Sequence, residues 1–139
     1  MDTNAIGTLT EMKCMTRLME MGFITSVPQI PSRYDFILDT GKNLFKVQVK
    51  TSHLDESIGF ISFNTASSRK RGNKTEHITY KNDNIDFFAT YYDNECYLIP
   101  VLECGSREKR MRVLPTRNGQ VQNICFLSDY LPENILKNK

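Results

Sequence analysis

Two short segments, residues 34–39 and 44–50, constrain the fold most, because only one parity of strand pairing suits both. They read Tyr-Asp-Phe-Ile-Leu-Asp and Leu-Phe-Lys-Val-Gln-Val-Lys, and a glycine-containing turn separates them. Side chains alternate across a strand, and directly opposed residues share a face. A shift from a four-residue loop to a two-residue turn moves the pairs but keeps this parity. The four-residue loop predicts the pairs Asp39–Leu44, Ile37–Lys46 and Asp35–Gln48.

One face of the predicted hairpin is uniformly apolar, so we expect it to lie in the core. A three-residue loop would mix the two faces and bury Lys46 and Lys50 with aromatic side chains, at the cost of unpaired buried charge. The other face carries Asp35, Gln48 and Lys50. The apolar face consists of Tyr34, Phe36, Leu38, Phe45, Val47 and Val49.

The segment before the hairpin predicts a helix over residues 5–21. Gly22 is a natural C-terminal cap. A helical repeat places five apolar residues on one stripe, which we expect to face the core. This stripe is Ala5, Leu9, Met12, Met15 and Met19.

Further strands are expected on both sides of the hairpin. Residues 23–30 predict a short edge or entry strand broken by Pro28. Residues 56–65 predict a strand that extends the sheet, and the polar, basic residues 67–74 predict an exposed loop. Other expected elements are strands at 84–92 and 96–101 that join at 93–95 and are covered on both faces, candidate strands at 112–114 and 121–127, and a short terminal helix capped by Ser128.

Composition fits a single domain over residues 1–139, and the expected helix and strands indicate an α/β (α+β) class. The chain is 40% hydrophobic and 24% charged. No apolar run approaches the roughly 18 residues of a membrane span, and the first residues lack a basic signal region. We therefore expect a soluble, intracellular protein. The cysteines Cys14, Cys96, Cys104 and Cys125 are scattered without a CxxC pair, and we expect reduced thiols.

The polar face of the hairpin offers the groups that metal-dependent phosphodiester hydrolysis needs. Asp35 can supply a carboxylate, Gln48 a side-chain carbonyl and Val49 a backbone carbonyl to a hard cation such as Mg²⁺. Lys50 can assist the base or stabilise developing charge. Separately, Asp35 could cap a turn and Lys50 could be a solvated surface lysine. Their joint arrangement favours the nuclease interpretation.

Glu11 is the candidate for a second carboxylate. Helical phase places it beside Cys14, Met15 and Leu18, on the flank of the core stripe. The alternative is a capping box that begins at Thr8, in which Glu11 marks the start of the helix. A helix that already includes Ala5 favours the metal-binding role.

The spacing of these residues carries a family resemblance. Asp35, twelve intervening residues, Gln48-Val49-Lys50 and an upstream Glu11 resemble the PD-(D/E)XK nuclease superfamily. Residues 34–38, 47–52 and 80–101 resemble its small intron-encoded homing endonucleases from bacteria and phages. The resemblance covers roughly residues 5–101, with Tyr34 in place of proline and Gln48 in place of an acidic residue.

The resemblance implies a helix packed on a mixed central sheet and Mg²⁺-dependent cleavage of double-stranded DNA, with Mn²⁺ able to substitute. For members encoded in bacterial group I introns it also implies a homotetramer on a long pseudo-palindromic site. The cellular location would be the bacterial cytoplasm and nucleoid, or the host cell of a bacteriophage. Because Gln48 lowers the negative charge of the site, Glu11 becomes more important.

Two basic segments are candidates for DNA contact, although basic residues also serve simply as solubilising surface. A chain this small covers little of a long target, so a dimer or tetramer is expected. Tyr91, Tyr92, Phe126, Tyr130 and Leu131 could form an interface or belong to the core. The basic segments are Arg69, Lys70, Arg71 and Lys74, and Arg107, Lys109, Arg110, Arg112 and Arg117.

The sequence thus predicts a homing endonuclease, with two alternatives. One is a junction-resolving or repair nuclease with the same chemistry. The other is a DNA-binding protein whose nuclease centre is degenerate, which Gln48 makes possible.

Overall fold

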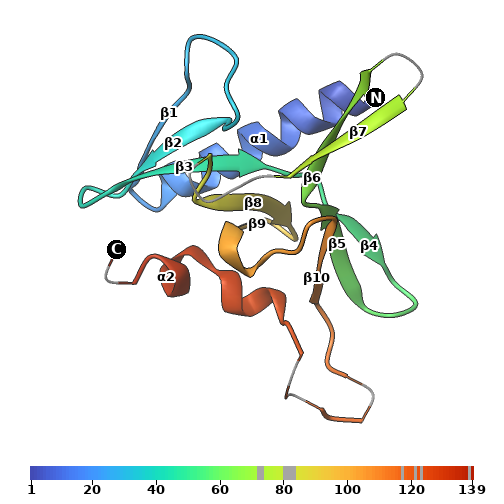
Figure 1. The fold of residues 1–139 in the computed structure, drawn as a ribbon. Coiled ribbons are helices and arrows are strands. Elements are labelled where there is room, and N and C mark those ends of the chain that lie inside the picture. Colours follow the sequence, from blue (N-terminus) through green and yellow to red (C-terminus); the bar gives the residue numbers. More distant parts are fainter. Residues whose placement is uncertain (72–73, 80–83, 117, 121, 123, 138) are drawn as a thin grey trace.

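A five-stranded mixed sheet is the centre of the fold in this computed structural model (Figure 1). The structure describes residues 1–71, 74–79, 84–116, 118–120, 122, 124–137 and 139, with backbone alone for 67–71 and 74–79. All neighbouring strands are antiparallel except β3 and β8, which are parallel. The strand order is β1 (Ile24–Ser26), β2 (Phe36–Asp39), β3 (Leu44–Val49), β8 (Phe87–Tyr92) and β9 (Glu95–Pro100).

The N-terminal helix α1 (Thr3–Glu20) packs against this sheet. Its N-cap is Asp2, whose Oδ1 accepts a hydrogen bond of 2.8 Å from the Ala5 N–H. It ends where Gly22 adopts a φ of +93°, a left-handed conformation that favours glycine. The predicted helix and its glycine stop are therefore confirmed.

The predicted apolar stripe of α1 is wrong. Met12 is 59% exposed and Met19 49% exposed, whereas Thr10, Cys14 and Leu18 are buried. Of the predicted stripe, only Met15 packs against the core. The small side chains of the buried face have partners in or next to the sheet. The hydroxyl groups of Thr10 and Thr51 are hydrogen-bonded, and the thiol of Cys14 contacts that of Cys96 in β9.

The hairpin of β2 and β3 has the predicted four-residue register. Asp39 opposes Leu44 and Ile37 opposes Lys46. Most of the predicted apolar face packs as expected, but Tyr34 does not. It precedes the paired residues, where the chain bends, and it packs in the second cluster described below. Strand alternation does not reach Tyr34 because pairing begins only at Phe36.

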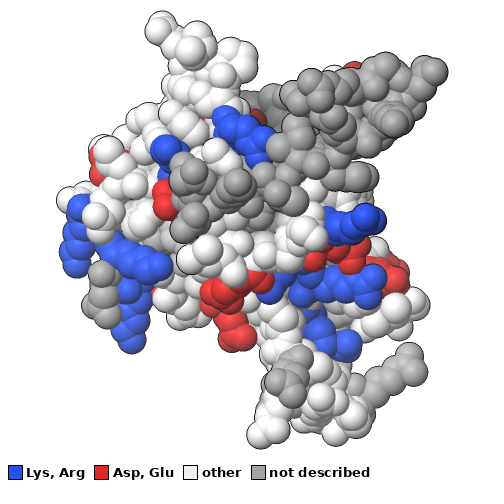
Figure 2. All heavy atoms as spheres, in the orientation of Figure 1, with Lys and Arg blue, Asp and Glu red and all other residues white. Residues whose placement is uncertain are grey.

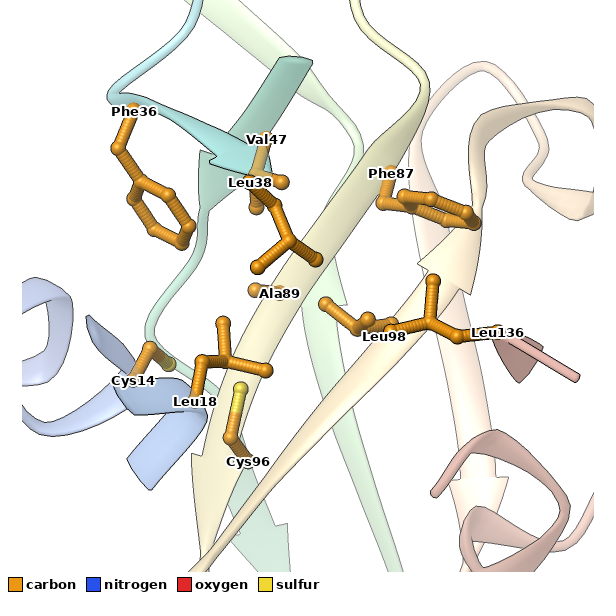
Figure 3. Close-up of a cluster of buried hydrophobic side chains, with 10 residues drawn as sticks. All are labelled: Cys14, Leu18, Phe36, Leu38, Val47, Phe87, Ala89, Cys96, Leu98 and Leu136. Carbon is orange, nitrogen blue, oxygen red and sulfur yellow. The ribbon is translucent and has the colours of Figure 1, made fainter. Parts of the chain in front are cut away.

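Two hydrophobic clusters cover opposite faces of the central sheet. On β8, Phe87 and Ala89 contribute to the first cluster and Phe88 to the second, which confirms the prediction of strands covered on both faces. In Figure 3, side chains from α1 point toward those of the strands. The first cluster is Cys14, Leu18, Phe36, Leu38, Val47, Phe87, Ala89, Cys96, Leu98 and Leu136. The second is Ile61, Phe63, Ile85, Phe88, Ile99, Val101, Met111, Leu127 and Tyr130.

A separate three-stranded sheet has the order β10 (Glu108–Arg112), β5 (Phe60–Asn64) and β4 (His53–Asp55). The strand expected within residues 56–65 is therefore present as β5, but it does not extend the central sheet. The physical reason is that β3 is already paired on both edges, by β2 and β8. The β5 side chains Ile61 and Phe63 instead lie in the second cluster.

The basic segment at 67–74 is a strand pair, so the predicted loop is wrong. β6 (Ala66–Arg71) and β7 (Lys74–Thr79) form an antiparallel ribbon, in which Arg69 opposes Glu76 and Arg71 opposes Lys74. Polar composition suggested a loop, but two polar strands can satisfy each other's backbone groups without a buried core. The turn between them lies outside the described residues. In Figure 1 the ribbon projects away from the central sheet.

The C-terminal part contains short helical elements, η1 (Val101–Glu103), η2 (Leu127–Tyr130) and α2 (Pro132–Ile135). The expected terminal helix is present, but its N-cap is Leu131, and Ser128 lies in η2. Only Arg112 of the segment 112–114 is in a strand, and within the described part of 121–127 the sole pairing is a bridge from Phe126 to Arg112. Tyr130 is buried, as expected for a core residue.

The four cysteines are free thiols, as predicted. No helix in the described ranges is long and apolar enough to cross a membrane.

The corrected face of α1 predicts which substitutions affect stability. Leu18→Ala removes a fully buried side chain and should lower the free energy of unfolding by about 2–5 kcal/mol. Met12→Ala changes an exposed side chain and should shift the free energy of unfolding by less than about 0.5 kcal/mol. Urea unfolding of both variants measures the difference. If Met12→Ala lowered the free energy of unfolding more than Leu18→Ala does, the methionine stripe predicted from the sequence would be the buried face after all.

Candidate active site

Asp35 lies immediately before β2 and is fixed to the end of β3. Its N–H donates to the Val47 carbonyl at 2.8 Å, and its Oδ2 accepts a hydrogen bond of 2.7 Å from the Val49 N–H. Strand pairing begins at Phe36, opposite Val47, so Asp35 lies just outside it and is held by these two hydrogen bonds, and the predicted pair of Asp35 with Gln48 stays a prediction. The hairpin therefore places the carboxylate beside the Gln48-Val49-Lys50 segment.

Both backbone groups of Lys50, its N–H and its carbonyl, are hydrogen-bonded to residues of β8. Its N–H donates to the Ala89 carbonyl at 2.8 Å, and its carbonyl accepts a hydrogen bond of 2.7 Å from the Thr90 hydroxyl. Its Nζ lies 6.0 Å from the centroid of the Phe88 ring. Burial raises the pKa of the Asp35 carboxyl group, and the charge of the ammonium partly offsets this rise. The main chain of the lysine is thus fixed, and its ammonium lies near a ring of the second cluster.

Glu11 lies in the interior of α1, which excludes the capping-box alternative, because Asp2 caps the helix. Burial and, to a smaller extent, the charge of Asp35 raise the pKa of Glu11. The side-chain hydroxyls of Thr10 and Thr51 lie 3.1 Å apart, next to Glu11 and Lys50 in the sequence. The structure therefore brings helix and hairpin together at this point.

Burial raises the pKa of both carboxyl groups above their ordinary values. For Asp35, the hydrogen bond from the Val49 N–H and the charge of Lys50 act in the opposite direction. Two acidic groups are thus partly withdrawn from water in the same place. A bound cation would relieve the cost of charging them.

The donor set fits a hard divalent cation, because every candidate ligand atom is oxygen. Glu11 and Asp35 would supply carboxylates, Gln48 an amide carbonyl and Val49 a backbone carbonyl. Among the described residues, no other residue makes a hydrogen bond to the Glu11 carboxylate or the Gln48 amide. No group of three or more His, Cys, Asp or Glu gathers in that part of the chain. The candidate acidic ligands are Glu11 and Asp35.

The candidate DNA-contacting residues lie on two other elements. Arg69, Lys70, Arg71 and Lys74 belong to the β6–β7 ribbon. Arg107, Lys109, Arg110 and Arg112 are on or next to β10, and Arg117 is outside the described residues. In Figure 2, basic and acidic side chains interleave over the region of β4, β5 and β10.

Several of the β10 residues already have partners. Arg110 forms an ion pair with Glu108. The Arg112 guanidinium donates to the carbonyls of Leu114 and Pro115, and the Lys109 ammonium donates to the carbonyl of Glu103. Glu108 thus offsets the charge of Arg110, whereas Arg112 and Lys109 keep their charge but are held by backbone carbonyls.

A comparison with protein families decides the class of enzyme. The family model of the PD-(D/E)XK endonuclease matches residues 1–132. The chain belongs to this family. It is therefore an endonuclease, and nucleases of this family generally use divalent metals and act on DNA.

A solved structure agrees with the fold of this PD-(D/E)XK endonuclease. It is that of a bacterial homing endonuclease, I-Ssp6803I, with a TM-score of 0.79 and 22% sequence identity, over 98% of this chain and 93% of the other. The likeness includes the N-terminal helix packed on a mixed sheet. No curated protein matches the chain.

Three threonines at the site were not identified from the sequence: Thr10, Thr51 and Thr90. Thr10 is buried in the middle of a helix, where threonine is a poor helix former. Thr51 directly follows Lys50, and Thr90 is fully buried within a strand of aromatic residues. For Thr90 the available signal was a polar residue in a strand expected to be covered on both faces, whereas Thr10 and Thr51 gave no such signal.

The raised pKa of Glu11 predicts how stability depends on pH without metal. Because the folded pKa lies above the ordinary value of 4.5, the folded state binds the proton more tightly, and stability falls as the pH rises through this range. Glu11→Gln should remove that loss, so the metal-free variant should be at least as stable as the parent at pH 8. Thermal unfolding in EDTA at pH 5 and pH 8 measures this.

The control for this experiment is Glu20→Gln, which removes an exposed carboxylate at the end of the same helix. A Glu11→Gln variant that is equally destabilised at both pH values would contradict the assigned burial.

Proposed function

We propose that this PD-(D/E)XK endonuclease is a site-specific, Mg²⁺-dependent homing endonuclease that cuts both strands of DNA. In this proposal Glu11, Asp35, Gln48 and the Val49 carbonyl hold the metal, and Lys50 lies beside the nucleophile. The supporting observation is the Asp35 carboxylate bound to the Val49 N–H, with the Lys50 charge and Glu11 next to it. Mn²⁺ has the same preference for oxygen ligands and should substitute.

Each residue has a distinct part in the proposed hydrolysis. Bound Mg²⁺ would polarise the scissile phosphate and lower the pKa of the attacking water. Lys50 orients that water or stabilises the charge that develops on the phosphate oxygens. The Val49 N–H holds Asp35 in place. Gln48 contributes oxygen without charge, so Glu11 supplies the second negative charge near the metal.

We propose that the β6–β7 ribbon contacts the DNA. A two-stranded antiparallel ribbon fits the major groove. Arg69, Lys70, Arg71 and Lys74 lie toward the end of the ribbon that is distant from Ala66 and Thr79. Arg107, Arg110 and Arg112 are proposed as secondary contacts to phosphate, because Arg110 and Arg112 already have protein partners.

Cleavage of both strands at one site requires two catalytic centres, whereas the described chain has one candidate centre. We therefore propose a homodimer or homotetramer on a pseudo-palindromic target. The fold shared with a bacterial homing endonuclease supports a role in group I intron mobility, in a bacterium or a bacteriophage.

Substitution at the proposed centre tests the chemistry. Lys50→Ala and Asp35→Asn should each lower kcat by about 10²–10⁴-fold, in line with the loss of a positioned catalytic group. Gel-shift affinity for DNA in EDTA should change little. Lys42→Ala, an exposed lysine in the turn of the same hairpin, is the matched control and should cut normally. Normal cleavage by both site variants would show that the residues are misassigned.

Two alternatives give different outcomes in the same assay. A degenerate centre would bind DNA but show no cleavage with Mg²⁺ or Mn²⁺, and the amide of Gln48 is the feature that favours it. A junction-resolving nuclease would prefer branched DNA to a linear target.

Homing has its own test. The protein should cut an intronless copy of the gene that neighbours its own coding sequence, because the recognition site is intact there. It should spare a copy that carries the intron, because the insertion divides the site. Cleavage rates on the two plasmids measure the preference, and equal rates would contradict homing.

A further inference from the structure

The proposed metal centre combines residues of two separate elements, so something must fix α1 relative to the end of β3. Glu11 comes from the helix, and Asp35 and Lys50 come from the hairpin. A contact between the two elements next to Glu11 is the candidate for this registration.

The hydrogen bond between Thr10 and Thr51 crosses this boundary. Their hydroxyl oxygens lie 3.1 Å apart. The Thr10 hydroxyl also donates to the Ile6 carbonyl at 2.9 Å, and a hydroxyl has one proton, so Thr51 is the donor to Thr10. Thr10 is only 9% exposed. Water therefore replaces this contact poorly.

The same bond lies next to both candidate catalytic elements. Thr10 directly precedes Glu11, and Thr51 directly follows Lys50. The Lys50 carbonyl in turn accepts a hydrogen bond from the hydroxyl group of Thr90, which is fully buried in β8. A continuous set of contacts thus runs from the helix through the end of β3 to the interior of the central sheet.

We propose that Thr10 and Thr51 are positioning residues that set the distance between the Glu11 carboxylate and the Asp35–Lys50 pair. This inference rests on the proposed metal-dependent function. The two threonines do not touch the metal or the DNA. They act by holding the two carboxylates close enough to share one cation, which matters more because Gln48 adds no charge.

The chain provides a matched control for this role. Thr8 is in the same helix, and its hydroxyl donates to the Asn4 carbonyl at 3.0 Å, the same type of bond that Thr10 makes to Ile6. Thr8 is exposed, and the described residues give it no partner outside the helix. Thr8→Val therefore removes the local bond alone, whereas Thr10→Val also removes the bond to the sheet.

The first experiment measures Mn²⁺ affinity of the full chain without DNA, by calorimetry or electron paramagnetic resonance. Thr10→Val and Thr51→Val should each weaken binding by about tenfold, the lower end of the effect of outer-shell partners on metal sites. The double variant should be no worse than either single one, because both remove the same bond. Thr8→Val and Thr10→Ser should bind like the parent.

The second experiment measures cleavage against Mg²⁺ concentration. Thr10→Val and Thr51→Val should raise the concentration needed for half-maximal rate by about tenfold, with metal-free DNA affinity unchanged. Identical metal responses of Thr10→Val and Thr8→Val would overturn the proposal, as would a parent that binds no Mn²⁺. A parent whose Mn²⁺ affinity depends on Thr10 and Thr51 but that cuts no DNA would instead refute the proposed function alone.

Discussion

The hydrogen bond from the Val49 N–H to the Asp35 carboxylate is the contact on which the candidate site depends. It joins a residue in a bend before β2 to the last residue of β3. β3 pairs with β2 on one edge and with β8 on the other, and hydrophobic clusters cover both faces of the sheet. Because the end of β3 is held by the sheet, the carboxylate that is hydrogen-bonded to it is held in a fixed position as well. Lys50, held by the backbone of β8, shares that support.

Without a bound cation, the partial burial of the Glu11 and Asp35 carboxylates lowers the stability of the fold. Burial raises the pKa of Glu11 and Asp35, which means that their charged forms are disfavoured where the fold places them. Sites that perform chemistry commonly accept such a cost. An amide at position 48 reduces it, because a further carboxylate would add repulsion. In the proposed centre, attraction for a metal would therefore depend on α1 as well as on the hairpin, and the packing of the helix would affect metal binding.

The hairpin could be predicted from the sequence, whereas the buried face of the helix could not. Parity in the hairpin is enforced by Phe36, Leu38 and Val47, since the other register would bury lysines. In α1 the methionines formed the more hydrophobic stripe, but burial of Thr10 and Cys14 depends on partners distant in sequence, Thr51 and Cys96. The basic ribbon was missed for a related reason: its strands satisfy each other's backbone, and polar composition alone does not reveal that.

The candidate site also has one part that the sequence predicts and one part that it does not. The closeness of Asp35 to the end of β3 follows from the register of the hairpin, a local property that the sequence contains. The approach of Glu11 to Asp35 is a tertiary property, and only the orientation of the helix against the sheet establishes it. The contacts that fix this orientation include hydroxyl groups, which hydrophobic patterns do not register. A buried threonine beside a catalytic motif is therefore informative: desolvating its hydroxyl is costly without a partner, and here the partner of Thr10 lies on the other element of the site.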